Sequence, residues 1–186
     1  MNDSRSVPSF SIGINDLQEH WRRLHALEEG ELIGVIDLTQ MPPWKVICGQ
    51  LHWQTYELGG GYFSAKHHGF CGVYRLIALE TPHDLSKPAK LARVGGEDDS
   101  GTLYLGEASD LSLRLNQMRR TARSYRSERS HGAINMLRQL RALDFPEEKL
   151  GVALMFTGRH TRSVERDLLH AYINSFGEMP PLNYRL

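Results

Sequence analysis

The chain has 186 residues, 40% of them hydrophobic and 24% charged, and its 22 basic and 22 acidic side chains cancel to a formal net charge of zero. These values are ordinary for a soluble globular protein of one domain, or of one domain with an extension, and balanced charge indicates neither a nucleic-acid nor a membrane partner. Two cysteines exclude a disulfide-rich scaffold, and no apolar run approaches the ~20 residues that span a bilayer.

The N-terminal region predicts a tail followed by a helix. Residues 1–10 are polar and lack the apolar core of a signal peptide, so we expect a cytoplasmic protein. Asn15-Asp16 are typical of a helix start. Apolar residues then recur at helical spacing, which predicts an amphipathic helix to about Glu29: Leu17, Trp21, Leu24 and Leu27.

Short strands are predicted next. Residues 31–38 form an apolar, β-branched run, and residues 46–56 have the composition of a second strand. Met41-Pro42-Pro43 separates the two runs, and Gly59-Gly60-Gly61 marks a turn or a linker. The chain therefore divides into two predicted parts: an N-terminal extension, residues 1–69, and a folded unit, residues 70–186.

The second part opens with two predicted strands and a helix. Residues 72–79 (GVYRLIAL) and 102–106 (TLYLG) are typical of strands, and the polar residues 81–101 between them indicate a long loop. Ser109-Asp110 can cap a helix that runs to about Arg123. Its apolar stripe consists of Leu111, Leu115 and Met118.

The remaining elements are a helix, a strand and a helix. Ser130 is typical of a helix cap, and Pro146 ends the helix that follows it. The apolar face of this helix consists of Ile134, Leu137, Leu140 and Leu143. Residues 149–157 predict a buried strand, and the last helix runs from Ser163 to a C-cap at Gly177. The element order predicts an α/β fold, a small sandwich with a mostly antiparallel, three-stranded central sheet flanked by helices.

Positive charge is concentrated in one part of the chain. Residues 114–141 hold eight arginines and one acid, Glu128, which gives 8 − 1 = +7 in 28 residues. Arginine suits bidentate phosphate contacts, and it is equally common in ion-pair networks on a solvated helix face. On the first interpretation five residues are candidates for nucleic-acid binding: Arg119, Arg120, Arg123, Arg126 and Arg129.

Five features in order resemble a known family. Gly72-Val73-Tyr74 and Tyr104-Leu105-Gly106 lie on neighbouring predicted strands, and Arg114 follows Tyr104 by ten residues on the next helix. Glu165 lies near the start of the last helix, and Pro181-Leu182-Asn183 follows that helix. In this order and on these elements, the residues resemble the GIY-YIG nuclease domain. The resemblance covers residues 72–183.

The resemblance implies a metal-dependent endonuclease that hydrolyses phosphodiester bonds in DNA. Glu165 would be the ligand of Mg²⁺ or Mn²⁺, since Mg²⁺ takes hard oxygen ligands. Arg114 would stabilise the charged phosphate. Tyr74 would accept a proton from water, Tyr104 would orient water or phosphate, and Asn183 would position the C-terminal segment and Glu165. Without the family context, each of these residues also has a structural interpretation, such as a core aromatic or a helix-dipole carboxylate.

The chain departs from the family pattern at two positions. Glu107 stands where many members have a lysine that helps a tyrosine to lose its proton, and Met118 stands where many have a histidine. His131 is a candidate replacement, because histidine suits proton transfer near neutral pH, or it is a surface residue at a helix start. The proton path is the part of the mechanism that these departures affect.

Two functions follow as hypotheses. The first is an endonuclease whose partner is DNA, with the N-terminal extension and the long loop supplying substrate choice or a homodimer contact. The second is a catalytically weakened or inactive GIY-YIG-fold module that binds DNA through the same arginines.

Overall fold

The computed structural model describes residues 17, 19, 21–22, 41–60, 69–123, 130–140, 143 and 145–184. The predicted strand at 31–38 and most of the predicted helix at 17–29 lie outside these residues, although Leu17, Glu19, Trp21 and Arg22 are helical. The elements in order are α2 (Trp44–Gln50), β1 (Gln54–Glu57), β2 (Gly72–Ala78), β3 (Leu91–Arg93), β4 (Gly96–Asp98), β5 (Thr102–Ala108), α3 (Leu111–Arg123), α4 (Gly132–Gln139), η2 (Glu147–Lys149), β6 (Leu150–Phe156), η3 (Gly158–His160) and α5 (Thr161–Phe176).

The central sheet has four strands in the order β1-β6-β2-β5, and every neighbouring pair is antiparallel. The prediction of an α/β fold with an antiparallel sheet is confirmed, but the predicted number of three strands is wrong. The fourth strand is β1, which belongs to the part of the chain assigned to the N-terminal extension. Its Gln54 and Thr55 are exposed, so this edge strand lacks the apolar alternation that identifies a half-buried strand.

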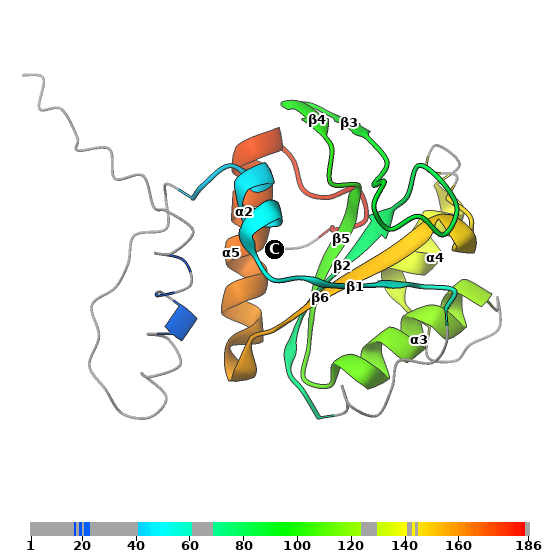
Figure 1. The fold of residues 1–186 in the computed structure, drawn as a ribbon, viewed down its shortest axis with the longest axis horizontal. Helices are drawn as coiled ribbons and strands as arrows, with labels where there is room; N and C mark the ends of the chain where they lie inside the picture. The colour runs from blue at the N-terminus through cyan, green and yellow to red at the C-terminus, as the bar shows by residue number, and fades with distance from the viewer. Residues whose placement is uncertain are drawn as a thin grey trace, which may run out of the picture.

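Helices cover both faces of the sheet (Figure 1): α2 and α5 lie on one side, and α3 and α4 on the other. Alternation along β2 places Tyr74 and Leu76 in the core under α3 and α4. Val73 enters the second core with α2 and α5, where Trp44 and Tyr172 pack edge to face at 5.3 Å. The sheet is therefore buried on both sides.

The segment at 46–56 was predicted to be a strand, and its first half is the helix α2. Trp44, Ile47 and Leu51 are buried at a spacing of three and four residues, which is the helical period. Pro43 precedes the first turn, where a proline costs no hydrogen bond. The β-branched residues in this stretch suggested a strand, but the burial of one helical face outweighs their propensity.

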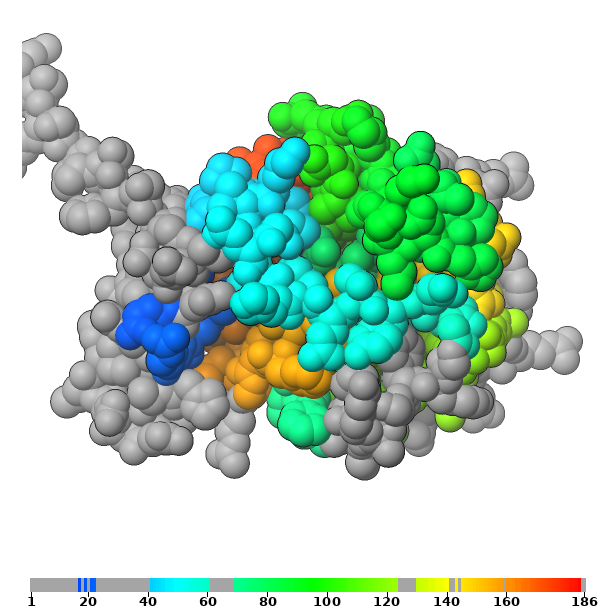
Figure 2. Space-filling model, in the orientation of Figure 1, coloured from blue at the N-terminus to red at the C-terminus, as the bar shows by residue number. Residues whose placement is uncertain are grey.

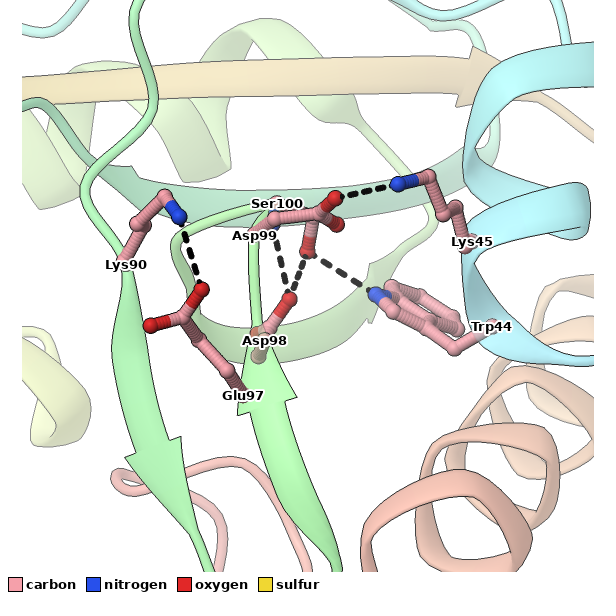
Figure 3. A network of polar contacts seen from close by, with 7 residues as sticks. All are labelled: Trp44, Lys45, Lys90, Glu97, Asp98, Asp99 and Ser100. Carbon is pink, nitrogen blue, oxygen red and sulfur yellow. Dashed lines mark hydrogen bonds and ion pairs between the residues drawn. The ribbon is translucent and has the colours of Figure 1, made fainter.

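The predicted loop 81–101 contains a two-stranded hairpin, β3–β4. The hairpin is held against the end of α5 at Gly95, whose amide donates to the Phe176 carbonyl at 2.8 Å. A glycine is needed there, because a Cβ would lie 2.8 Å from the carbonyl carbon of Phe176. Figure 3 shows that Ser100 joins the hairpin to α2: its hydroxyl bonds Asp98 at 2.6 Å and accepts from the Trp44 indole at 2.9 Å. Figure 2 shows residues 41–57 and 79–100 side by side on this face of the molecule.

The last elements follow the predictions closely. The strand predicted at 149–157 is β6, and the last helix ends where Gly177 adopts the left-handed conformation at φ 72°. Helix α4 is shorter than predicted: Leu140 is its extended C-cap, and Leu143 lies beyond it. Among the described residues, no helix is long and apolar enough to cross a membrane.

Candidate active site

Tyr74 on β2 and Tyr104 on β5 lie side by side on the face covered by α3 and α4. Tyr74 pairs with Gly106 and Leu76 pairs with Tyr104, so the tyrosines are diagonal neighbours across the two strands. Their ring centroids are 6.0 Å apart. The prediction that the two tyrosines lie on neighbouring strands is confirmed, and their rings adjoin. Tyr74 is fully buried, whereas Tyr104 is half-buried.

The glycines of both motifs make room for this arrangement. A Cβ on Gly106 would lie 2.5 Å from Tyr104 Cε1 and 2.7 Å from the Tyr74 hydroxyl oxygen. A Cβ on Gly72 would lie 2.3 Å from the Met155 carbonyl oxygen and 2.7 Å from Leu111 Cδ1. Contacts this short do not occur between real side chains, so each glycine is required by the packing of its neighbours.

Helix α3 brings Arg114 to the Tyr74 hydroxyl. The Asp110 carboxylate caps this helix by accepting from the Leu113 amide at 2.9 Å, which satisfies one of the unpaired N–H groups of the first turn. Arg114 follows in the same turn, and its Nε–H donates to the Tyr74 oxygen at 2.9 Å. Its Nη1 donates to Gln117 Oε1 at 3.0 Å. The guanidinium is therefore oriented before any ligand binds.

His131 lies against both tyrosines and is fully buried, so it is not the surface residue of the alternative prediction. Its Nε2 lies 3.0 Å from the Tyr74 hydroxyl, and its ring meets Tyr104 edge to face at 5.6 Å. Burial and the charge of Arg114 lower the pKa of His131 to about 3, which leaves the imidazole neutral at pH 7. The Tyr74 oxygen therefore lies within hydrogen-bond distance of both Arg114 Nε and His131 Nε2.

The Tyr74 hydroxyl is held in its protonated form. Burial raises its pKa, the neighbouring Tyr104 adds to the shift, and Arg114 opposes it. The other nitrogen of His131, Nδ1, is buried without a hydrogen-bond partner in the described part of the chain. A buried polar nitrogen without a partner is costly, and a catalytic role or a bound water is among the explanations for such a group.

Glu165, on the second turn of α5, faces the same cluster. It is half-buried, and burial together with the charge of Glu107 raises the pKa of its carboxyl group to about 7. Arg114 opposes this shift. After burial, the Glu165 charge is the largest cause that raises the pKa of Tyr104, so the carboxylate and the tyrosine interact electrostatically.

Glu107 links the end of β5 to the start of α5. Its carboxylate accepts from the Thr161 hydroxyl at 2.9 Å and lies 3.8 Å from Arg162 Nε. It thus anchors the first turn of the helix that carries Glu165, a role that the sequence did not reveal. The sequence signal for this role was the position of Glu107 directly after Gly106, where the family pattern has a lysine.

The donor set suits a hard cation. Two carboxylates, Glu165 and Glu107, act on each other strongly enough to raise a pKa, and oxygen ligands with several retained waters are what Mg²⁺ prefers. No group of three or more histidine, cysteine, aspartate or glutamate side chains converges within the described ranges. The residues therefore fit an ion held by one or two carboxylates and water.

Asn183 holds the C-terminal segment against the open edge of β5. Its Oδ1 accepts from the Leu105 amide at 2.9 Å, and its Nδ2 donates to the Leu105 carbonyl at 2.8 Å. The Leu182 amide adds a bond of 2.9 Å to the Leu103 carbonyl. Leu182 and Asn183 together thus hold β5 on either side of Tyr104. Within the described part of the chain, the hydrogen bonds of the Asn183 side chain go to Leu105 and not to Glu165.

The predicted phosphate-binding arginines occupy different environments. Arg119 is buried and donates to the Gly60 carbonyl at 3.1 Å, and Arg123 pairs with Glu147 at 2.7 Å. Arg120 is exposed. The remaining two predicted residues, Arg126 and Arg129, lie outside the described residues.

A cavity of about 560 Å³ opens beside Arg114. Its lining comes from the end of β5 and one face of α3: Glu107, Ala108, Ser109, Asp110, Leu113, Arg114, Asn116, Gln117 and Arg120. Its lining combines two carboxyl groups, Glu107 and Asp110, with two arginines, Arg114 and Arg120. Guanidinium groups in a cavity of this kind can bind a phosphate.

No protein-family model, no curated protein and no solved structure matches the chain. The fold is that of an α/β protein whose four-stranded antiparallel sheet places Tyr74 and Tyr104 on one face, where Arg114 from α3 and His131 from the start of α4 contact Tyr74. Glu165 comes from α5, which covers the other face of the sheet.

Proposed function

We propose that the protein is a metal-dependent endonuclease that hydrolyses phosphodiester bonds in DNA through a GIY-YIG-type active site. The observation that carries the proposal is the hydrogen bond of 2.9 Å from Arg114 to the Tyr74 hydroxyl, beside Tyr104 and on the side that Glu165 faces. Four separate elements contribute these side chains. A structural core has no need of a half-buried glutamate and an arginine converging on two tyrosines.

Phosphodiester hydrolysis needs stabilisation of charge on the phosphate, an activated water and help for the leaving oxygen. Arg114 lies in the cavity with its fork already oriented, so it can bind a phosphate oxygen without reorganisation. Glu165, with Glu107 nearby, would hold Mg²⁺ or Mn²⁺. The bound ion would supply Lewis acidity at the phosphate.

The contact between Tyr74 and His131 supports a proton-transfer role. The Tyr74 oxygen lies 3.0 Å from Nε2 of the neutral His131, and in the tautomer that carries its hydrogen on Nδ1 the imidazole would accept the tyrosine proton at Nε2. Arg114 helps to keep the pKa of His131 low. A phosphate that binds Arg114 would neutralise part of that charge, and the basicity of His131 would rise when substrate is present.

The arginine placements refine the DNA contact. Arg120 lies on the cavity wall and is exposed, so it is suited to a backbone phosphate next to the one at Arg114. Arg119 and Arg123 instead hold the turn at Gly59-Gly60 through bonds to its carbonyls. We therefore assign Arg120 to DNA and leave Arg126 and Arg129 as predicted contacts.

A second function is favoured by one observation. The Tyr74 hydroxyl is fully buried and burial raises its pKa, which is unfavourable for a base that must meet water. Together with Glu107 in place of a lysine, this supports a DNA-binding module whose cutting is weakened or lost. Such a module would keep the cavity and Arg120.

Incubation of the purified protein with supercoiled plasmid and Mg²⁺ or Mn²⁺ tests the two functions. Metal-dependent nicking or linearisation is expected for the wild type and is lost in Glu165→Ala and Arg114→Ala. Glu97→Ala is the matched control, because Glu97 is an exposed carboxylate that pairs with Lys90 on the hairpin. Tight plasmid binding without cutting in either metal, with mixed genomic DNA also uncut, would replace the nuclease with the binding module.

A further inference from the structure

An exposed aromatic pair lies at the end of the sheet that carries the site. Phe70 is 53% exposed and Phe156 is 40% exposed, and their ring centroids are 5.3 Å apart at an angle of 58°. Solvent-exposed phenylalanines in contact with each other form an apolar patch, and such patches on a folded surface often mark binding sites. Neither ring is used by the proposed hydrolysis.

The fold holds this pair in place. Phe156 ends β6 opposite Gly72, the first residue of β2, which also pairs with Ala108 at the end of β5. The Phe70 carbonyl accepts from the Leu111 amide at 3.0 Å, and the adjacent Gly69 amide donates to Asp110 Oδ2 at 2.9 Å. These two bonds fix the backbone at Phe70 to the N-terminus of α3, while the ring of Phe70 is exposed to solvent.

The pair is continuous with the proposed phosphate site. Asp110, which anchors Gly69, lines the cavity and accepts from the Arg114 amide through its carbonyl at 3.1 Å. Leu113, in the first turn of α3, also lines the cavity and is 62% exposed. One surface therefore joins a guanidinium for a phosphate, an exposed leucine and an exposed aromatic pair.

We propose that Phe70, supported by Phe156, is a stacking platform for an unpaired base, so that the substrate is DNA with a single-stranded segment beside the cut phosphate. Aromatic rings beside backbone-binding cations are the arrangement by which proteins hold single strands, because every base has a face to stack while a duplex base already stacks on its neighbours. This inference rests on the proposed nuclease function for the identity of the phosphate at Arg114.

Fluorescence anisotropy with the full chain tests the platform, using a labelled single strand and the same sequence as a blunt duplex. Phe70→Leu keeps an apolar side chain but removes the aromatic face. We expect it to weaken single-strand binding about 5- to 100-fold and to leave duplex binding within about twofold. Phe70→Trp should restore single-strand binding. Val94→Ala, at an 82% exposed apolar position on the hairpin, is the control.

The outcomes separate this inference from the proposed function. Equal loss on single strand and duplex, or no loss on either, would overturn the platform, and plasmid cutting that depends on Glu165 would then leave the nuclease standing. Loss confined to the single strand and rescued by tryptophan supports the platform. These comparisons use variants whose thermal melting shows an unchanged fold. A wild type that binds neither DNA form would overturn both proposals.

Discussion

The half-buried carboxyl group of Glu165 has a pKa of about 7, because burial and then the charge of Glu107 oppose its ionisation. The unfolded chain ionises this group near its ordinary value of 4.5, so the folded state holds more protons between pH 4.5 and 7. A raised carboxyl pKa therefore destabilises the fold as the pH rises through this window. Above pH 7 the full cost is present, and below pH 4.5 it vanishes.

Glu165→Gln removes the ionisation and should stabilise the metal-free protein at pH 8. The expected gain is about 1–2 kcal/mol after allowance for partial exposure, which corresponds to roughly 2–8 °C in Tm for a chain of this size. At pH 4 no gain is expected. Thermal melts in a chelator at both pH values measure the difference. An equal gain at both would show that ionisation is not the cause.

Gly106→Ala tests the packing of the two tyrosines. The added methyl group would meet Tyr104 and Tyr74, both of which are held by neighbours, so we expect a loss of about 1–3 kcal/mol and a loss of plasmid cutting. Gly49→Ala is the matched control, because nothing lies within 4 Å of the new atom and alanine favours the α2 helix. Urea unfolding compares the two. A neutral Gly106→Ala would mean that the rings move apart at little cost.

At the scale of elements, Asn183 takes the place of a neighbouring strand at the free edge of β5. Its side-chain amide makes both hydrogen bonds of a ladder pair with Leu105, on the outer edge of the sheet. An unprotected edge exposes unpaired backbone groups and invites pairing with other chains. The same two bonds hold β5 in register next to Tyr104, so a structural residue far along the chain supports the site.

Asn183→Ala should free the Leu105 amide for exchange with solvent. The two lost hydrogen bonds predict a cost of about 1–3 kcal/mol. Hydrogen exchange followed by NMR measures the effect directly: protection of Leu105 falls, whereas protection of Val152, within the β6 ladder, changes only by the global loss of stability. Equal falls at both amides would show that Asn183 contributes to global stability alone.

The elements differ in how well their sequences predicted them. The strands β2 and β6 and the helices α3 and α5 have long apolar patterns with clear caps, and each was placed within a few residues. The short β1, β3 and β4 strands have three or four residues each and polar faces, so their pairing depends on partners distant in sequence. The helix α2 has apolar residues at helical spacing, Trp44, Ile47 and Leu51, but the β-branched residues of the same stretch favour a strand, and burial against α5 decides between the two.

The candidate site was predictable where it depends on the order of the elements along the chain. The motif order placed Tyr74 and Tyr104 on adjacent strands and Arg114 on the helix above them, because antiparallel pairing follows from the chain order. The burial of His131 and of Arg119 could not be predicted, since each depends on how α4 or the turn at Gly60 packs in three dimensions.

Over the whole molecule, the net charge of zero hides an uneven distribution along the chain, because positive charge is concentrated in residues 114–141. Of the eight arginines between residues 114 and 141, Arg119 is buried and Arg123 is paired with Glu147. These two arginines are therefore engaged within the protein. Of the arginines that the structure describes in this segment, Arg114 and Arg120 line the same cavity and are suited to a phosphate there.

Salt dependence measures that number. Each phosphate contact releases condensed counterions, so removing one reduces the slope of log K against log salt by about 0.9 on duplex DNA. Arg120→Ala should lower the slope by this amount and weaken duplexes of different sequence equally. Lys45→Ala is the control and should leave the slope unchanged. Lys45 is an exposed cation on α2 that pairs with Asp99, and α2 covers the other face of the sheet from α3, which carries Arg120. An unchanged slope in Arg120→Ala would mean that DNA does not follow the wall of this cavity, and the phosphate path would then have to lie on another face of the molecule.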